Sequence, residues 1–390
     1  MYGSSTDLYL FITFFQLTPG TKHIAVIISP LNALMHDQAE MFSRHGIKCA
    51  SINSESGLDL RTLDFNKFDI LLLTPEQALS SKFRVRLDIK LKRKLCLIAL
   101  DEAHCVTQWG QTAFRPEYAQ MADFLAVIPE TPVLVLTATM SKSMEITTMT
   151  ALYLSSYITV AISPDRPEIY LDIKPYAVGC LQWLIDELLI KQNQCDKSVI
   201  YCRSIKQVMF VYETILHALK ERVHVPSDKK TGENRLVEQF SASVDPSVKK
   251  RVLRLFPLNA NLRVVVTTVA FGMGINISDI RNVILWGVPE SYCHFWQQVG
   301  RGCRDGKNGQ AVVYLYRVPN SLTTSSELKE TLRPSLNQCV RLEVLKQLWL
   351  PAMGELPVKG PKCMLSCLCC KCAYCLCCMF CRSVCPCRAM

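Results

Sequence analysis

Short runs of apolar residues alternate with helix-like segments through the first half of the chain. Four aliphatic runs occupy positions 23–29, 69–73, 95–100 and 133–136, and a helical pattern over 32–45 follows the first of them. Continuous apolar runs of this length are typical of strands that are buried on both faces of a parallel sheet. The pattern therefore predicts a doubly wound α/β domain, with helices on both faces of its sheet.

The same pattern restarts after a proline-containing segment at 164–167, which is expected to be a linker. Helix-like stretches such as 206–222 separate the new apolar runs. The strand candidates of this half occupy 197–201, 263–267, 282–286 and 310–316. They predict a second α/β domain of the same kind, in which the polar stretch 226–247 forms a loop or an insertion.

No strand candidate follows position 319, where a helical stretch over 328–350 leads into a tail crowded with cysteine. The expected organisation is a first lobe over 1–164, a second lobe over 165–320 and a helical, cysteine-rich segment over 321–390. The two lobes are predicted to repeat one fold without any exact repeat of sequence.

The composition is that of a globular protein, because 49% of the 390 residues are hydrophobic and 20% are charged. This length is sufficient for two or three domains. The net charge of +10 fits a polyanionic partner, although many basic proteins bind none. The apolar run 8–17 is too short to span a bilayer, and Asp7 precedes it where a secretory signal carries basic residues. A soluble intracellular protein without a membrane partner is therefore expected.

Two acidic residues come directly after the third apolar run, in the sequence Asp101-Glu102-Ala103-His104. The carboxyl ends of parallel strands meet at the edge where such sheets bind ligands. A nucleotide hydrolase needs one carboxylate to hold Mg²⁺ and another to orient or deprotonate water. Asp101 fits the first role and Glu102 the second, and His104 is suited to couple this site to a neighbouring lobe. Acidic pairs also occur at strand ends without any function. The residues around this pair must therefore show whether it is catalytic.

Those surrounding residues resemble one helicase family closely. Residues 101–118 read DEAHCVTQWGQTAFRPEY, which is similar to the Walker B box and aromatic-rich loop of the RecQ-type DNA helicases in superfamily 2. In that family the loop couples DNA binding to hydrolysis, and Trp109, Phe114 and Arg115 match its DNA-contacting residues. Aromatic rings and guanidinium planes stack on bases of any sequence. The spacing from Trp109 to Arg115 is one residue longer than in the family, and ordinary core aromatics are the alternative interpretation.

Further segments match the family's motifs in the required order. Ser29-Pro30-Leu31 resembles motif Ia and Thr74-Pro75-Glu76 resembles motif Ib, where hydroxyls and backbone amides are suited to grip DNA phosphates. Thr137-Ala138-Thr139 resembles motif III, whose hydroxyls link hydrolysis to strand separation in the family. Asp165-Arg166-Pro167 resembles the start of the second lobe, and Tyr201-Cys202-Arg203-Ser204 resembles motif IV, which implies that Arg203 binds DNA.

The second lobe holds the most specific matches. Residues 267–276 (TTVAFGMGIN) resemble motif V and residues 297–306 (QQVGRGCRDG) resemble motif VI. Glycine lets a backbone approach a ligand closely, and an arginine on the γ-phosphate stabilises the transition state. Cys303 stands where the family has glycine, beside Arg304. The resemblance implies nucleotide-binding roles for Gly272, Gly274, Gly300 and Thr139, and catalytic roles for Gln297, Arg301 and Arg304.

The resemblance covers about residues 20–320 and implies two RecA-like lobes, with ATP and Mg²⁺ bound between Asp101-Glu102 and the motif VI arginines. It implies a helicase that moves 3′ to 5′ on single-stranded or forked DNA and acts in repair and recombination. Nuclear residence would follow from that role, and no protein partner is implied. A neighbouring group of RNA helicases is a third interpretation, which the loop over 109–118 disfavours because that string is characteristic of the DNA group.

One required motif is missing from the sequence. A P-loop needs a glycine-rich turn followed by Lys-Ser or Lys-Thr, which cradles the phosphates and binds Mg²⁺. Upstream of position 23 only Gly3-Ser4-Ser5 resembles it, and no lysine directly follows these residues. Either the N-terminal part of the gene product is incomplete, or the chain is a variant that has lost hydrolysis. We therefore expect this chain to hydrolyse ATP poorly or not at all, and its alternative function is that of a catalytically dead DNA-binding protein.

Eleven of the 20 cysteines lie between 363 and 387. In the RecQ family a cysteine on a helix joins a later Cys-x-x-Cys-x-x-Cys cluster to bind zinc, and four thiolates make a closed structural site. By that resemblance the ligands are Cys339, Cys369, Cys372 and Cys375. Substitutes in the same tail are Cys367, Cys370, Cys378 and Cys381. A metallothionein-like tail and a frame-shifted end are the alternatives.

Overall fold

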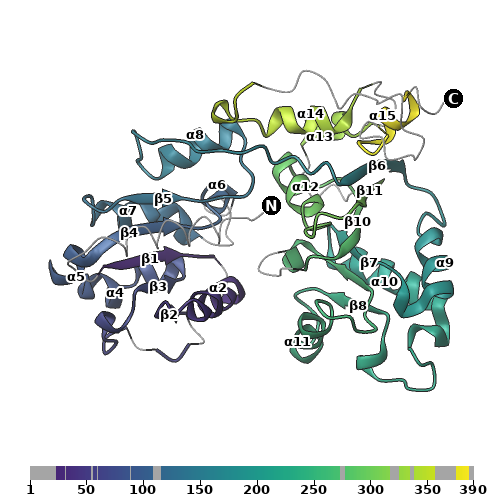
Figure 1. The fold of residues 1–390 in the computed structure, drawn as a ribbon, viewed down its shortest axis with the longest axis horizontal. Helices are drawn as coiled ribbons and strands as arrows, with labels where there is room; N and C mark the ends of the chain where they lie inside the picture. The colour runs from purple at the N-terminus through teal and green to yellow at the C-terminus, as the bar shows by residue number, and fades with distance from the viewer. Residues whose placement is uncertain are drawn as a thin grey trace. The chain divides into compact units, whose positions relative to one another are not determined.

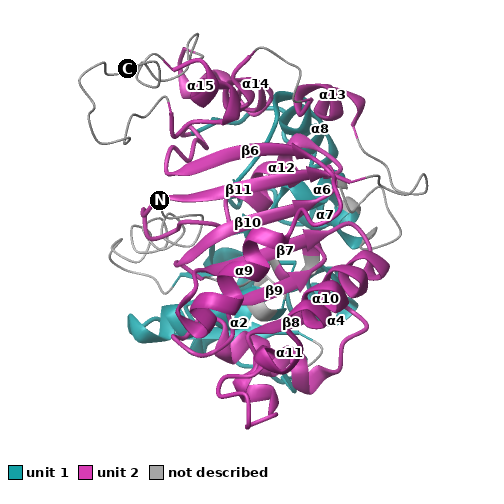
Figure 2. Ribbon diagram, turned by 90° about the vertical axis from the view of Figure 1, so that its right-hand side faces the viewer, with its two compact units in different colours: residues 1–161 teal, residues 162–390 magenta. Residues whose placement is uncertain are grey.

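The chain divides into two compact units, residues 1–161 and residues 162–390 (Figure 2). The computed structural model describes residues 23–30, 32–53, 56–58, 60–87, 89–108, 116–272, 277–316, 325–333, 338–355 and 375–385. Each unit is built around one parallel sheet, so the predicted class of two tandem doubly wound α/β domains is confirmed. None of the described helices is long and apolar enough to cross a membrane.

The first unit contains a five-stranded sheet in the order β2-β3-β1-β4-β5, and all of its neighbouring strands pair in parallel (Figure 1). Its strands are β1 (Ile24–Ile28), β2 (Cys49–Ile52), β3 (Ile70–Leu73), β4 (Leu95–Leu100) and β5 (Val133–Val135). Its helices are α2 (Asn32–Arg44), α3 (Pro75–Leu79), α4 (Ser81–Arg86), α5 (Ile89–Lys94), α6 (His104–Gln108), α7 (Met121–Ala126) and α8 (Lys142–Ala151).

Successive residues of the central strands enter different cores, as the period of two in a strand requires. On β1, Ile24, Val26 and Ile28 belong to the core that is shared with α3, α4 and α7. Ala25 and Ile27 face the smaller core on the other side, which α2 completes. Both faces of the sheet are therefore buried at its centre, which explains why the sequences of the central strands are uniformly apolar.

The second unit contains a six-stranded parallel sheet in the order β6-β11-β10-β7-β9-β8 (Figure 2). Its strands are β6 (Ile169–Pro175), β7 (Lys197–Cys202), β8 (Val237–Phe240), β9 (Val264–Thr267), β10 (Ile280–Trp286) and β11 (Gly309–Leu315). Its helices are α9 (Gln182–Lys191), α10 (Ile205–Leu219), α11 (Pro246–Leu255), α12 (Tyr292–Val299), α13 (Ser326–Thr331), α14 (Val340–Gln347) and α15 (Met379–Ser383).

Side-chain caps set where several helices begin. The hydroxyls of Ser80, Ser141, Ser204 and Ser291 each accept a hydrogen bond from the backbone amide three residues later, and so does the hydroxyl of Thr74. Such caps satisfy amides that have no partner inside the helix, and each typically contributes about 1 kcal/mol.

The strand candidates of both halves are confirmed, and the expected loop at 226–247 is wrong. That stretch contains β8 and the first residues of α11. β8, an edge strand, was not predicted because its sequence, VEQF, has two polar residues at its centre and contains no apolar run. β2 and β6 were also not predicted, since neither is a continuous apolar run.

Candidate functional site

Asp101 follows β4 at the carboxyl edge of the first sheet. Its backbone amide continues the ladder to β1, donating to the carbonyl of Ile28 at 2.9 Å. The side chain is 2% exposed and accepts two hydrogen bonds of 2.9 Å, from Gln38 Nε2 and from the Glu102 amide. The carboxylate is therefore fixed in a single orientation by its own strand end and by α2.

Burial raises the pKa of Asp101 to about 6, and the nearby charge of Glu102 adds to the rise. The hydrogen bond from Gln38 opposes it. At neutral pH the group is nevertheless ionised, and each of its oxygens has a lone pair left for a hard cation. Asp101 thus fits the Mg²⁺-holding role that was predicted for it.

Glu102, His104 and Thr137 form a polar chain beside Asp101, in which His104 is buried and the other two residues are half-buried. Glu102 has a φ of +50°, in the left-handed region, which costs a non-glycine residue about 1 kcal/mol or more. His104 Nδ1 lies 3.2 Å from Glu102 Oε2 and 3.1 Å from Thr137 Oγ1. The Thr137 hydroxyl in turn donates to the Thr139 carbonyl at 3.1 Å. The acidic box and motif III are therefore joined through His104, and the strained backbone aims Glu102 at the histidine.

The residues predicted to grip DNA in this unit lie at the same edge but are buried. Ser29 follows β1 and is fully buried, and Pro30 is buried beside it. Thr74 is 6% exposed and its hydroxyl caps α3, accepting from the Gln77 amide at 3.4 Å. Their DNA contacts stay predictions. Trp109, Phe114 and Arg115 lie outside the described residues.

In the second unit, α12 ends in the turn that carries Arg301 and Arg304. The amide of Gly300 donates to the Trp296 carbonyl at 2.8 Å, and Gln297 lies one turn before Arg301. Burial raises the pKa of Tyr201, and the charges of Arg301 and Arg304 oppose that rise. Arg301 lies close to Tyr201, near the end of β7, because both residues line the same small cavity.

Cys303 occupies this turn with a φ of +55°, a backbone conformation that favours glycine. Its side chain is 1% exposed. A Cβ atom on Gly309 would lie 2.4 Å from Cys303 Sγ and 2.4 Å from the Arg281 carbonyl oxygen. The turn thus tolerates cysteine at the family's glycine position because Gly309, at the start of β11, leaves room for the sulfur.

The remaining predicted residues of this unit are placed as follows. Arg203 is held against the loop before α12, because Nη1 donates to the Val288 carbonyl at 2.7 Å and Nη2 pairs with Glu290 at 3.3 Å. Gly272 ends a short 3₁₀ helix, Val269–Gly272. Gly274 lies outside the described residues.

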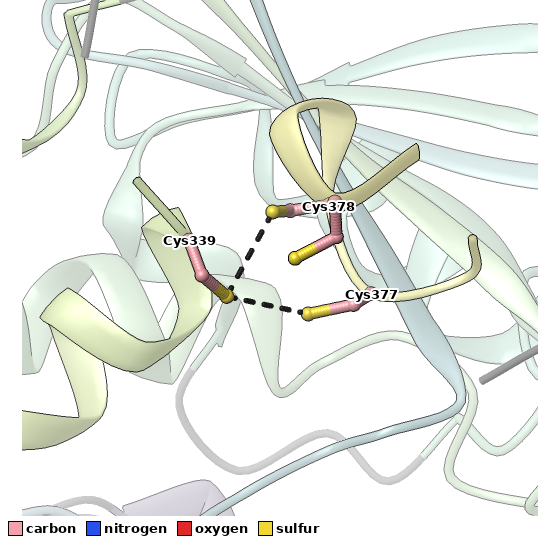
Figure 3. Close-up of side chains that lie close together, drawn as sticks. Cys339, Cys377 and Cys378 are labelled. Carbon is pink, nitrogen blue, oxygen red and sulfur yellow. Dashed lines mark hydrogen bonds between the residues drawn. The ribbon is translucent and has the colours of Figure 1, made fainter. Parts of the chain in front are cut away.

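Four cysteines gather where α14 meets the tail, and Figure 3 labels three of them, Cys339, Cys377 and Cys378. The sulfur atoms of Cys339, Cys377, Cys378 and Cys381 all lie within 4.8 Å of one another. Cys339 Sγ is 3.5 Å from Cys377 Sγ and 3.9 Å from Cys378 Sγ. Zinc–sulfur bonds of about 2.3 Å place the sulfurs of a tetrahedron about 3.8 Å apart, so this cluster fits zinc.

Hydrogen bonds couple the four thiols of the cluster to one another. Hydrogen bonds from Cys339, Cys377 and Cys381 hold the pKa of the Cys378 thiol below its ordinary value. A hydrogen bond with Cys377 likewise lowers the pKa of Cys339. The hydrogen bond with Cys339 is the largest cause that raises the pKa values of Cys377 and Cys381. Zinc binds thiolates, so its binding would release the protons of these thiols.

The predicted zinc ligands differ from this cluster in all but Cys339. Cys375 is buried nearby but is not a member of the group, and Cys369 and Cys372 lie outside the described residues. Cys378 and Cys381 were recognised as substitutes, whereas Cys377 was not. The cysteine spacing of three repeats along the tail, so sequence alone cannot fix which members reach Cys339.

Two family models match the chain. Residues 6–147 match the model described as DEAD/DEAH box helicase, and residues 180–306 match the helicase conserved C-terminal domain. An ATP-dependent DNA helicase RecQ from Haemophilus influenzae is 30% identical over 296 residues, which are 75% of this chain and 44% of the relative. The chain belongs to the RecQ family of superfamily 2 helicases.

Another relative of this RecQ-family chain is the mouse bifunctional 3′-5′ exonuclease/ATP-dependent helicase WRN. It is 30% identical over 320 residues, which are 80% of the chain and 21% of the relative. The RecQ-family chain therefore spans less than half the length of either relative.

Solved helicase structures share the fold. Yeast Dbp5 bound to RNA and ADP BeF3 matches with a TM-score of 0.60 at 15% identity, covering 81% of this chain and 77% of Dbp5. Mycobacterium smegmatis Lhr bound to ssDNA and AMP-PNP matches with a TM-score of 0.57 at 16% identity, covering 89% of this chain and 50% of Lhr. The RecQ-family chain thus has the predicted tandem RecA-like architecture.

Sequence reasoning missed the polar residues that position the recognised motifs. Gln38 lies on α2, after the motif Ia segment, and its side chain holds Asp101. Arg166 and Arg341 bind backbone carbonyls inside the second unit and were given no role. The available signal was a charged or amide residue within an otherwise buried segment, which requires a partner.

Proposed function

We propose that this chain is the core of an ATP-dependent DNA helicase that moves 3′ to 5′ and acts in repair and recombination. The observation that carries the proposal is the connected arrangement of Asp101, Glu102, His104 and Thr137 at the carboxyl edge of the first sheet, in which Asp101 and His104 are buried. Residence in the nucleus follows from that role and belongs to the same proposal.

Each residue has a separate task in this account. Asp101 holds Mg²⁺, which neutralises charge on the phosphates of ATP. Glu102 orients and deprotonates the attacking water, and His104 passes changes at Glu102 to the hydroxyl of Thr137. Arg301 and Arg304, with Gln297, act on the γ-phosphate of the same nucleotide. Thr139, Gly272, Gly274 and Gly300 are proposed to line the nucleotide.

The proposed nucleic-acid partner is single-stranded or forked DNA. The net charge of +10 favours phosphate contacts. Trp109, Phe114 and Arg115 would stack on bases, and Ser29, Pro30, Thr74 and Arg203 would position the backbone. The four-cysteine cluster is proposed to bind one structural zinc ion through Cys339, Cys377, Cys378 and Cys381.

The test is ATP turnover with and without single-stranded DNA, followed by unwinding of duplexes that carry either a 3′ or a 5′ tail. Because residues 1–22 contain no Gly-Lys-Ser or Gly-Lys-Thr, turnover is expected to stay below about 1 s⁻¹. Stimulation by DNA and preference for the 3′ tail would support the proposal. A preference for the 5′ tail would overturn the polarity.

The same missing lysine favours a second candidate function. A chain without that lysine loses both phosphate binding and transition-state stabilisation. In this alternative, the protein holds DNA without hydrolysing ATP. Binding of single-stranded DNA without measurable turnover would establish it.

A further inference from the structure

Arg166 connects the segment before β6 to the turn that carries the motif VI arginines. Its Nη1 donates to the Gly300 carbonyl at 2.9 Å and its Nη2 to the Gly302 carbonyl at 2.8 Å. These two carbonyls lie on either side of Arg301. Nε of Arg166 pairs with Glu168 at 2.5 Å, and the side chain is 7% exposed. The planar guanidinium therefore uses all three of its nitrogens and grips the turn at two points.

Arg341, on α14, holds Arg166 in place from the other side. Its Nη1 donates to Asp165 Oδ1 at 2.7 Å and to the Arg166 carbonyl at 2.8 Å. Its Nη2 donates to the Ile169 carbonyl and, at 3.1 Å, to the Cys377 carbonyl. With 4% exposure, Arg341 joins the backbone of the cysteine cluster to the backbone of Arg166.

The turn that carries Arg301 and Arg304 is also tightly packed against its neighbours. A Cβ atom on Gly300 would lie 3.1 Å from the Trp296 carbonyl, and one on Gly302 would lie 3.1 Å from a methyl group of Val283. Trp296 also donates to the Pro164 carbonyl at 2.8 Å, beside the same segment. A shift of the Asp165–Arg166 backbone would consequently be passed to the carbonyls of Gly300 and Gly302.

We propose that Arg166 and Arg341 are positioning residues, through which the four-cysteine cluster sets the orientation of Arg301 and Arg304. The inference rests on the proposed ATP hydrolysis, in which these two arginines act on the γ-phosphate. A displacement of about 1 Å in a group that contacts the transition state lowers turnover by about 10²-fold. Arg166 and Arg341 thus form a relay between the cysteine cluster and the turn. Through this relay the rate of hydrolysis depends on the structure of the cluster.

Hydrogen exchange of the full chain tests the relay directly. The amides of Arg301, Gly302 and Cys303 are hydrogen-bonded to the carbonyls of Gln298, Val299 and Ile280, so their exchange reports on the turn. In Arg166→Ala and Arg341→Ala we expect these amides to exchange at least about tenfold faster. Amides of α10 should keep their wild-type rates, which excludes general unfolding. Arg254→Ala, which removes an exposed pair with Glu233, is the matched control. It should change neither the exchange rates of the turn amides nor those of the α10 amides.

Steady-state kinetics supply the readout that a purely structural role would not move. We expect kcat to fall by about 10- to 100-fold in both alanine variants, with KM for ATP within about twofold of wild type. Arg166→Lys should restore only part of kcat, because an ammonium group cannot reproduce the fork across two carbonyls. A rise in KM at unchanged kcat would overturn the positioning role.

A double variant tests the link to the cluster. Cys378→Ser should accelerate exchange at the turn, and combining it with Arg341→Ala should add nothing, since both act through one path. Independent, multiplicative effects would overturn the involvement of the cluster. Unchanged exchange in Arg166→Ala would overturn the relay itself. If the wild-type chain shows no turnover, the proposed function fails, and the exchange rates alone decide whether the turn is held in this way.

Discussion

At the scale of single residues, chemistry is concentrated in side chains whose conformation the sequence does not reveal. The sequence predicted that Asp101 and Glu102 follow a buried strand, and they do. It could not predict the left-handed φ of Glu102 or the hydrogen bond from Gln38 to Asp101. Both depend on contacts between segments far apart in the chain, which local patterns do not encode.

Asp101→Asn should stabilise the protein above pH 6 and remove part of its pH dependence. The unfolded carboxyl loses its proton near its ordinary value of 3.8, whereas the folded one keeps it until about 6. Unfolding free energy therefore falls as pH rises between these values, by at most about 3 kcal/mol, and stays low above them.

Urea unfolding from pH 4 to 7.5 measures this effect as the difference between wild type and variant. The control is Asp186→Asn, which replaces an exposed carboxylate on α9. Equal slopes for wild type and Asp101→Asn would contradict the assigned burial of this carboxylate.

Gly309→Ala should destabilise the second unit by about 2 kcal/mol, because the new Cβ would overlap the Arg281 carbonyl and Cys303 Sγ. Gly46→Ala is a useful comparison, since its Cβ would meet open space but its φ is +77°. There we expect a loss of about 1 kcal/mol from the backbone alone. Thermal unfolding of both variants measures the difference, and a Gly309→Ala protein as stable as wild type would disprove the crowding.

At the scale of elements, the strands that could be predicted are those buried on both faces. Continuous apolar runs identified β1, β3, β4, β7, β9, β10 and β11, and also the partly buried edge strand β5. The missed strands are the edge strands β2, β6 and β8, each of which has at least one polar residue that interrupts the apolar run. On an edge strand one side lacks a neighbour, so polar side chains are tolerated and the apolar signal is weak.

Glu238 on β8 shows how such a polar position is stabilised. It is 3% exposed and pairs with Arg251 at 2.7 Å and with Arg235 at 3.5 Å. Glu238→Gln should cost about 2 kcal/mol, because two partly buried arginines lose their countercharge. Burial raises the pKa of Tyr212 to about 12, and the negative charge of Glu238 is the second cause of this rise. The pKa of Tyr212 should therefore fall in the variant.

Chemical denaturation and a spectroscopic titration of tyrosine follow the two effects. Glu233→Gln is the control, since its pair with Arg254 is exposed on both sides and should contribute less than about 1 kcal/mol. An equal loss of unfolding free energy in Glu238→Gln and Glu233→Gln would show that burial of the Glu238 pair contributes no additional stability.

At the scale of the whole molecule, the sequence predicted two RecA-like lobes and a cysteine-rich end. It could not choose among the eleven cysteines of the tail, because their spacing permits several clusters. The choice depends on β6, whose Leu171 amide donates to the Cys377 carbonyl at 3.2 Å. Arg341 fixes the same carbonyl from α14, so tertiary contacts select Cys377 and its neighbours.

The purified chain should contain about one zinc ion per molecule at this cluster. Cys378→Ser should lose most of that zinc, since three thiolates leave the tetrahedral site open. Cys195→Ser removes a buried thiol elsewhere in the second unit and should keep its metal. Elemental analysis of the three proteins decides the point, and equal zinc in all of them would refute the cluster as the site.

The measurement that tests the central claim most directly is ATP turnover by the purified chain, with and without single-stranded DNA, beside Glu102→Gln. Glu145→Gln is the control, since Glu145 lies on α8 and accepts a hydrogen bond from Thr159. We predict slow turnover that DNA stimulates, that Glu102→Gln reduces by at least about 10²-fold, and that Glu145→Gln leaves intact. Turnover that survives in Glu102→Gln would contradict the assignment of this site to ATP hydrolysis, and DNA binding without any turnover would establish the second candidate function instead.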